Sequence, residues 1–199
     1  MPNLRVEDLT KNYGVTRALD HIDFEVASGE FFTILGPSGA GKTTILDLIA
    51  GIKPADEGTI YFDDEPVNEL FPQERDVAMA FENYSLYPHM SVYENIIFPL
   101  NAPGRTNEYT QDEKDSRVRE IADVLGIGNL LDRRPQHLSG GQKQRASLAR
   151  AMVRKPRFYL LDEPIAHLDA KLKVSARTTL KKLAATLGTT IIYVTHDWK

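Results

Sequence analysis

The run at residues 36–44 is Gly36-Pro37-Ser38-Gly39-Ala40-Gly41-Lys42-Thr43-Thr44. It matches the pattern G-x-x-x-x-G-K-[ST], in which successive backbone N–H groups form a nest for phosphate oxygens. Gly39 and Gly41 permit backbone conformations that are closed to residues with a Cβ. Lys42 is placed to reach the β- and γ-phosphates, and the Thr43 hydroxyl is a ligand for Mg²⁺. We therefore predict that this loop binds a nucleoside triphosphate with magnesium.

The sequence around this loop favours a functional site over an ordinary Gly-rich turn. The apolar run at residues 30–35 is typical of a buried strand, and residues 43–50 predict a helix that ends at Gly51. The N-terminus of such a helix adds its positive dipole to the phosphate nest. At average composition the pattern should arise by chance in well under roughly 1% of chains of this length.

A second apolar run, residues 158–161, ends in two carboxylates, Asp162 and Glu163. A buried parallel strand delivers its carboxyl end to the crevice where ligands bind. Asp162 is then placed to hold Mg²⁺, directly or through water, and Glu163 to orient and deprotonate an attacking water. Alone, such a strand end is more often two solvated acids, but the phosphate loop favours the catalytic interpretation. A guanine-reading Asn-Lys-x-Asp motif is absent, which favours ATP over GTP.

Strand and helix patterns alternate along most of the chain, which predicts a largely parallel sheet covered by helices. The segment from about residue 90 to 155 is mostly helical and is interpreted as an insertion. Ser91 and Thr110 each precede a glutamate by three residues, as in a capping box, and Ser139 begins a third helix. We expect strands over residues 4–13, 18–26, 30–35, 58–62, 77–81, 158–161 and 190–194, and helices over 43–50, 91–100, 110–125, 139–155 and 170–187.

The composition is ordinary for a globular domain of 199 residues, with 42% hydrophobic and 26% charged residues. The net charge of -4 gives no sign of a basic nucleic-acid binder, so we expect no nucleic-acid partner. The absence of cysteine excludes disulfides, thiol catalysis and cysteine-bound metals. No signal peptide and no bilayer-spanning apolar stretch is recognisable, so a membrane role is expected to come through a partner.

The run Leu138-Ser139-Gly140-Gly141-Gln142 gives the chain a family resemblance. It resembles the signature of ABC transporter ATPases, and it lies in the helical insertion as it does there. Residues 82–90, Glu-Asn-Tyr-Ser-Leu-Tyr-Pro-His-Met, most resemble the ATPases of bacterial and archaeal sugar importers. The likeness covers nearly the whole chain. It implies an α/β P-loop NTPase fold with a mainly parallel core sheet, an N-terminal antiparallel β subdomain and an inserted α-helical signature subdomain. The core would span about residues 1–89 and 156–199, and the helical subdomain about 90–155.

The resemblance also assigns roles to residues outside the loop. Tyr13 matches the aromatic residue that stacks on adenine, and Glu82 falls where the family's glutamine loop ligates magnesium. Asp169 matches the aspartate of the D-loop, and His196 matches the switch histidine at the γ-phosphate. An aromatic residue in a strand is usually core, and His196 alone could be any histidine at a strand end. The ordered set of motifs favours the functional interpretation of both.

In this family two ATPase chains pack head to tail, and each signature closes on the γ-phosphate that the other chain holds. Ser139 would cap a helix whose N-terminus offers free N–H groups, while Gly140 and Gly141 let the backbone approach a phosphate. Alone, Ser-Gly-Gly is more often a plain helix cap. The resemblance implies a second ATPase chain (identical or different), integral membrane permease subunits and, indirectly, a solute-binding protein. The expected location is the cytoplasmic face of the cell membrane.

Three departures from the family pattern bear on these expectations. Position 82 is glutamate where most members have glutamine, and we expect the carboxylate to keep the metal role. Ala166-His167 stands where sugar importers usually have Ser-Asn, which suggests an asymmetric pair with a different ATPase. The chain stops three residues after His196, so we expect the C-terminal part of the domain and any regulatory domain to be missing.

The sequence as a whole predicts the ATP-hydrolysing subunit of an importer that takes up a sugar or a related solute, with ATP and Mg²⁺ as cofactors. Two alternatives stay open. One is an ABC ATPase without a transporter, acting on ribosomes or DNA, although such proteins usually carry two ATPase halves or a long coiled-coil insertion. The other is a nucleotide-binding fragment without activity.

Overall fold

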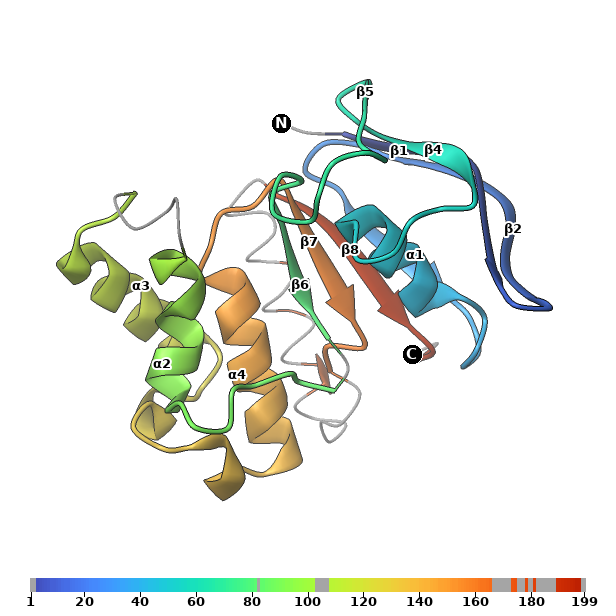
Figure 1. Cartoon of the computed structure of the whole chain (residues 1–199). Coiled ribbons are helices and arrows are strands. Elements are labelled where there is room, and N and C mark those ends of the chain that lie inside the picture. The colour runs from blue at the N-terminus through green and yellow to red at the C-terminus, as the bar shows by residue number, and fades with distance from the viewer. Residues whose placement is uncertain are drawn as a thin grey trace. The chain divides into compact units, whose positions relative to one another are not determined.

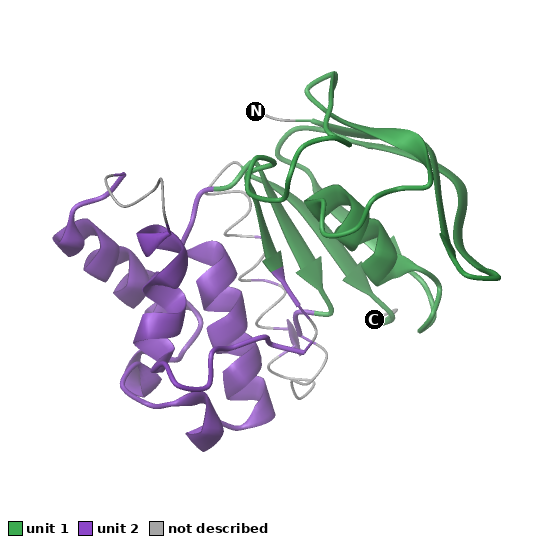
Figure 2. Cartoon of the chain, in the orientation of Figure 1, with its two compact units in different colours: residues 1–79, 156–163, 183–199 green, residues 80–155, 164–182 purple. Residues whose placement is uncertain are grey.

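The structure, a computed structural model, describes residues 3–81, 83–102, 108–165, 173–174, 178, 181 and 189–197. The chain divides into two compact units (Figure 2). Unit 1 comprises residues 1–79, 156–163 and 183–199, and unit 2 comprises residues 80–155 and 164–182. Most of the helix expected over residues 170–187 lies outside the described residues, and the four described positions between 173 and 181 are helical.

Unit 1 begins with an antiparallel sheet in the order β2-β1-β4-β5 (Figure 1). Its central strand β1 pairs with β2 on one side and with β4 on the other. Leu4, Val6 and Leu9 of β1 are fully buried, so one face of the sheet contributes to the core. The strands are β1 (Leu4–Tyr13), β2 (Thr16–Val26), β4 (Glu57–Phe62) and β5 (Glu65–Pro66).

A second sheet in unit 1 has the order β3-β8-β7-β6, and β8 runs parallel to both of its neighbours. Every residue of β7 and β8 is buried, as expected of apolar strands at the centre of a parallel sheet. Helix α1 (Lys42–Ala50) packs on this sheet, where Leu46 and Ile49 join the core. The strands are β3 (Phe31–Leu35), β6 (Val77–Ala80), β7 (Phe158–Asp162) and β8 (Thr190–Thr195). The expected α/β fold class, with an antiparallel and a parallel sheet, is therefore confirmed.

The burial predicted for the strand before the loop is wrong. Thr33 and Leu35 of β3 are exposed, and the remaining apolar residues of the strand are only partly buried. The apolar composition of residues 30–35 led to the prediction. In the described sheet, however, β3 is an edge strand with β8 on one side, so its side chains have fewer neighbours to cover them.

Unit 2 is helical, and its helices begin as the capping patterns predict. The hydroxyls of Ser91, Thr110 and Ser139 each accept a hydrogen bond from the backbone N–H three residues later, and all three form reciprocal capping boxes. The helix expected over residues 91–100 is shorter, because Pro99 cannot continue the α-helical hydrogen bonds and a 3₁₀ turn follows. The elements are α2 (Val92–Ile97), η1 (Phe98–Asn101), α3 (Gln111–Val124), η2 (Gly128–Leu130), η3 (Pro135–His137) and α4 (Gly140–Met152).

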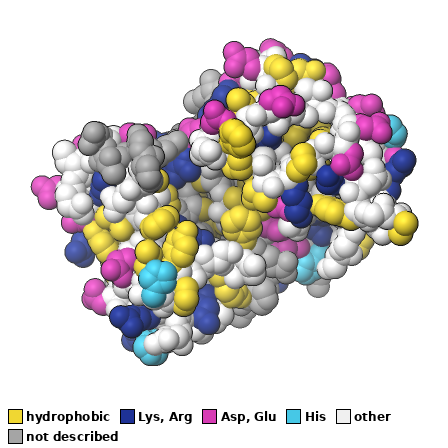
Figure 3. All heavy atoms as spheres, in the orientation of Figure 1, with side chains coloured by type: hydrophobic (Ala, Val, Ile, Leu, Met, Phe, Trp, Pro, Cys, Tyr) yellow, Lys and Arg dark blue, Asp and Glu magenta, His cyan; other side chains and the backbone are white. Residues whose placement is uncertain are grey.

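One face of the chain carries side chains of both charges (Figure 3). On the face shown in Figure 3, acidic and basic side chains are interspersed rather than gathered by sign. Within the part of the chain that the structure describes, no helix combines the length and the apolar character needed to cross a bilayer.

Candidate functional site

The loop at residues 36–41 joins the end of β3 to the start of α1, and its glycines have the backbone angles that the pattern requires. Gly39 and Gly41 have φ values of +81° and +85°, and Gly41 is the N-cap of α1. A Cβ on Gly41 would lie 2.5 Å from the carbonyl oxygen of Ala18 and 2.9 Å from Cδ2 of Leu19. The loop therefore packs directly against β2 at a point where only glycine fits.

We expect Gly41→Ala to lower the free energy of unfolding by about 2 to 4 kcal/mol, because left-handed strain adds to the clash with Ala18. Gly39→Ala is the matched control, since its φ is also positive but nothing lies within 4 Å of the added Cβ. The free energy of unfolding of Gly39→Ala should fall by only about 1 kcal/mol. Urea unfolding of both variants measures the difference. Equal losses would contradict the close packing of the loop on β2.

Lys42 is held inside this loop. Its side chain is buried, and its Nζ donates hydrogen bonds of 2.9 Å to the carbonyl oxygens of both Gly36 and Pro37. The two bonds fix two of the three donors of the ammonium group, and the third is the one that a phosphate oxygen would accept. The sequence pattern predicted a lysine at the phosphates, and the structure places its ammonium against the loop backbone.

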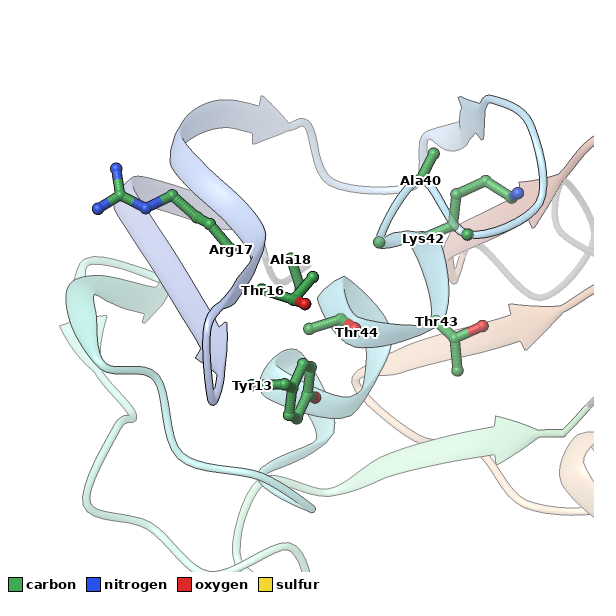
Figure 4. A pocket seen from close by; sticks show the side chains of 10 residues that line it. Tyr13, Thr16, Arg17, Ala18, Ala40, Lys42, Thr43 and Thr44 are labelled. Carbon is green, nitrogen blue, oxygen red and sulfur yellow. The ribbon is translucent and has the colours of Figure 1, made fainter.

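A pocket of about 530 Å³ opens between the loop and the hairpin of β1 and β2, a size typical of small-molecule sites. In Figure 4, Tyr13 and Thr16 face the first turn of α1, whereas Arg17 extends away from them. Arg17 donates a hydrogen bond to Asp20. The sequence motifs did not indicate Thr16, Arg17 and Ala18, although their place in the hairpin after Tyr13 could have done so. The lining residues are Tyr13, Thr16, Arg17, Ala18 and Gly39 to Thr44.

The acidic strand end lies at the carboxyl end of β7 and is buried. Asp162 is 3% exposed, and Glu163, with a φ of +47°, is 6% exposed. One carboxylate oxygen of Glu163, Oε1, accepts a 2.8 Å bond from the backbone N–H of His196 and lies 2.6 Å from its ring Nδ1. The other, Oε2, accepts a 3.2 Å bond from the Thr195 hydroxyl. No pattern in the sequence indicated the contact between the Glu163 and His196 side chains.

Three of the sequence motifs meet where neighbouring parallel strands end. Thr195, the last residue of β8, pairs with Leu35 at the end of β3, and its carbonyl accepts a 3.3 Å bond from the N–H of Gly36. Its hydroxyl bonds to Glu163, and the backbone N–H of Glu163 donates to Val194. Parallel strands present their carboxyl ends at one edge of the sheet, which is why the loop, the acid and the histidine come together.

The donors for a metal ion at this edge are hard oxygens. Thr43 is the second residue of α1 and is exposed, and Figure 4 shows its hydroxyl on the side of the helix away from Tyr13. Asp162 supplies a buried carboxylate. The described residues include no group of three or more His, Cys, Asp or Glu side chains arranged for a metal. Magnesium needs only one or two protein oxygens when phosphates and waters supply the rest, so the donors present fit it.

The signature run begins α4 in unit 2. The Ser139 hydroxyl accepts a 3.3 Å bond from the N–H of Gln142, whose side-chain oxygen accepts a 2.9 Å bond from the N–H of Ser139. Ser139 and Gly140 are exposed, so the first turn of the helix presents backbone N–H groups at the surface. Two further predicted site residues, Glu82 and Asp169, lie outside the described residues, as do Ala166 and His167.

Comparisons with known proteins agree with this arrangement. Residues 19–166 match the family described as ABC transporter. The chain is 49% identical over 203 residues to the trehalose/maltose import ATP-binding protein MalK of Thermococcus litoralis, covering 99% of this chain and 54% of that protein. It is 49% identical over 197 residues to the sn-glycerol-3-phosphate import ATP-binding protein UgpC of Ruegeria sp. (strain TM1040), covering 99% and 55%. The chain thus spans about half the length of these relatives.

A solved structure shares the fold. The dimeric post-hydrolysis structure of the ATP-binding cassette MJ0796, bound to ADP and Pi, superposes with a TM-score of 0.87 and 32% identity. The match covers 98% of this chain and 88% of that one.

Proposed function

Since the chain belongs to the ABC transporter family, we propose that it binds and hydrolyses ATP as the energy-supplying subunit of an importer. The observation that carries this proposal is the meeting of Gly36, Glu163 and His196 around Thr195, at the carboxyl ends of three parallel strands. A phosphate nest, a carboxylate base and a histidine at one edge of a sheet are the parts that in-line attack on a γ-phosphate requires.

Within this site we propose a division of roles along the nucleotide. Tyr13 stacks on adenine, the backbone of residues 36–44 holds the phosphates, and Lys42 donates to their β- and γ-oxygens. Thr43 and Asp162 hold Mg²⁺, with Glu82 as a further ligand. The metal neutralises charge on the phosphates when it is bound.

The contact between Glu163 and His196 implies an order of events. Oε1 of Glu163 accepts the bond from the backbone N–H of His196 and also lies against its ring, so the ring occupies one side of the carboxylate. The His196 side chain is 51% exposed and can turn toward a phosphate. When the ring turns away, Oε1 keeps the bond from the backbone N–H of His196 and can also accept a proton from the attacking water. His196 then stabilises charge on the γ-phosphate.

We propose that the second half of the site comes from another chain. Ser139, Gly140, Gly141 and Gln142 at the start of α4 would bind the γ-phosphate held by the loop of a partner, with Asp169 at the same interface. The exposed first turn of α4 supports this role, since helix N-termini bind anions. The dimeric structure of MJ0796, at 32% identity, supports it as well. The partner is an identical or a similar ATPase.

The names of the relatives support a proposal for the solute and the location. MalK and UgpC are named for the import of trehalose or maltose and of sn-glycerol-3-phosphate. We propose that the solute here is a sugar or a related polyhydroxy compound, delivered by a solute-binding protein to integral membrane permeases. The ATPase would then be bound peripherally at the cytoplasmic face of the membrane.

We propose that residues 84–88 carry the nucleotide state to the permease. Tyr84 and Ser85 have positive φ values of 65° and 46°, so their backbone needs support from its surroundings. Arg150 of α4 supplies it, donating 3.2 Å and 2.8 Å bonds to their two carbonyl oxygens and lying 5.4 Å from the Tyr87 ring centroid. A movement of the signature helix is thus transmitted to this segment.

We expect Arg150→Met to uncouple uptake from ATP hydrolysis. Without the guanidinium the carbonyls of Tyr84 and Ser85 lose their shared donor, so the segment no longer follows α4. Uptake by the assembled transporter in vesicles should fall by roughly two- to thirtyfold, at unchanged ATP affinity. Arg145→Met is the matched control, because Arg145 also lies on α4 but bonds to the carbonyls of Leu125 and Gly126. Equal losses of uptake in both variants would indicate a general effect on α4 and contradict the proposed coupling through Arg150.

The proposed function is tested by phosphate release from Mg-ATP together with purification from membranes. We expect hydrolysis and co-purification with an integral membrane protein. Nucleotide binding without phosphate release would instead favour an inactive fragment. Hydrolysis with ribosomes or DNA as the only partner would favour an ABC ATPase that serves no transporter.

A further inference from the structure

Two ammonium groups lie beside the ring of Tyr13. Nζ of Lys53 is 5.1 Å from the ring centroid and Nζ of Lys11 is 5.8 Å from it, both within the range of a cation–π interaction. The described residues that line the pocket include Tyr13 but neither lysine. The Tyr13 ring therefore lines the pocket and also lies near two cations that are not part of the pocket lining.

Each ammonium is fixed by a carboxylate. Lys53 lies 2.8 Å from Asp47, which is 7% exposed, and Lys11 lies 2.8 Å from Asp56. The pKa of Lys53 is raised, first by its bond to Asp47 and then by the Tyr13 hydroxyl. Lys53 thus stays charged at neutral pH and has a fixed place beside the ring.

The fixed cation matters because Tyr13 lies at an exposed strand end. It is the last residue of β1, next to the hairpin turn, and its side chain is 42% exposed. A ring that rotates freely must be ordered when a ligand stacks on it, which weakens binding. A cation held beside the ring restricts its rotation before the ligand binds. Less rotational freedom is then lost on binding, although the cation does not touch the ligand.

We propose that Lys53, assisted by Lys11, positions the Tyr13 ring for stacking on adenine and so sets the affinity for the base of ATP. This inference rests on the proposed function, in which Tyr13 contacts adenine. Asp47 belongs to the same helix, α1, that carries Lys42 and Thr43 at its N-terminus. One helix therefore fixes both the phosphate end of the site and, through Asp47 and Lys53, the base end.

The test compares a ligand that has the base with one that lacks it. In Lys53→Met we expect the Kd for Mg-ATP to rise about two- to fivefold, with KM rising equally and kcat unchanged. The Kd for magnesium tripolyphosphate should stay the same, which also shows that the variant is folded. Lys53→Arg should restore the affinity for ATP, because the guanidinium keeps a cation near the ring.

Arg5→Met is the matched control, since the Arg5 guanidinium lies 4.0 Å from the Tyr61 ring centroid in the same antiparallel sheet. Loss of the Arg5 guanidinium should leave the Kd for Mg-ATP and the Kd for magnesium tripolyphosphate unchanged. The double variant Tyr13→Ala/Lys53→Met should bind ATP as weakly as Tyr13→Ala alone, because the lysine acts through the ring.

The possible outcomes separate the two proposals. If Tyr13→Ala weakens ATP binding but Lys53→Met does not, the role of Lys53 is overturned and the proposed function stands. The role is also overturned if Lys53→Met weakens ATP and tripolyphosphate equally, or if the losses in the double variant add. If the unaltered chain does not bind ATP, the proposed function itself fails.

Discussion

Glu163→Gln should lower the rate of ATP hydrolysis by roughly 10²- to 10⁴-fold and leave ATP binding unchanged. The amide has the shape of the carboxylate, and its oxygen can still accept the bond from the backbone N–H of His196. It cannot take a proton from water. The site would therefore keep its geometry and lose its base.

Single-turnover hydrolysis with excess enzyme measures this effect without interference from product release. Glu65→Gln is a suitable control, because Glu65 lies exposed on β5 and takes no part in the proposed site. Hydrolysis at the rate of the unaltered chain in Glu163→Gln would mean that another group activates the water.

Lys42→Met should raise the Kd for Mg-ATP by about tenfold or more, because a hydrogen bond from a charged donor contributes roughly 1.5 to 3 kcal/mol. Methionine keeps the apolar stem that is buried in the loop and removes the ammonium. Hydrolysis should fall below detection, since the Lys42 ammonium also stabilises charge on the γ-phosphate as the bond between the β- and γ-phosphates breaks.

Isothermal titration with Mg-ATP measures the affinity, and a thermal melt shows whether the loop survives the loss of the bonds to Gly36 and Pro37. Lys143→Met, on α4, is the control for removing one positive charge. An unchanged Kd in a folded Lys42→Met chain would rule out the loop as the phosphate site.

Local patterns predicted most of the fold. Capping boxes at Ser91 and Thr110 and the glycine at position 51 act within a few residues, so their helix ends could be read from the sequence. The burial of β3 could not, because it depends on which strands lie beside it. The early end of the helix before Pro99 could have been predicted from the sequence, since proline breaks the α-helical hydrogen-bond ladder.

The candidate site likewise has parts that local sequence patterns predict and parts that depend on the tertiary fold. The loop and the acidic strand end are contiguous in sequence, and their residue types suffice to suggest the chemistry. The contact of Glu163 with His196 spans 33 positions and arises from the register of β7 and β8. The approach of Lys53 to Tyr13 likewise depends on the packing of α1 near the first hairpin, for which no local pattern exists.

The most direct test of the central claim, that each nucleotide site is completed by the signature of another chain, is sedimentation of Glu163→Gln with and without ATP. We expect a monomer without nucleotide and a dimer with ATP and Mg²⁺. In the same background, Ser139→Phe should bind ATP with the same Kd and remain a monomer, because the bulky ring blocks the exposed first turn of α4. ATP-bound Glu163→Gln that stays monomeric, or a dimer that survives Ser139→Phe, would contradict the claim.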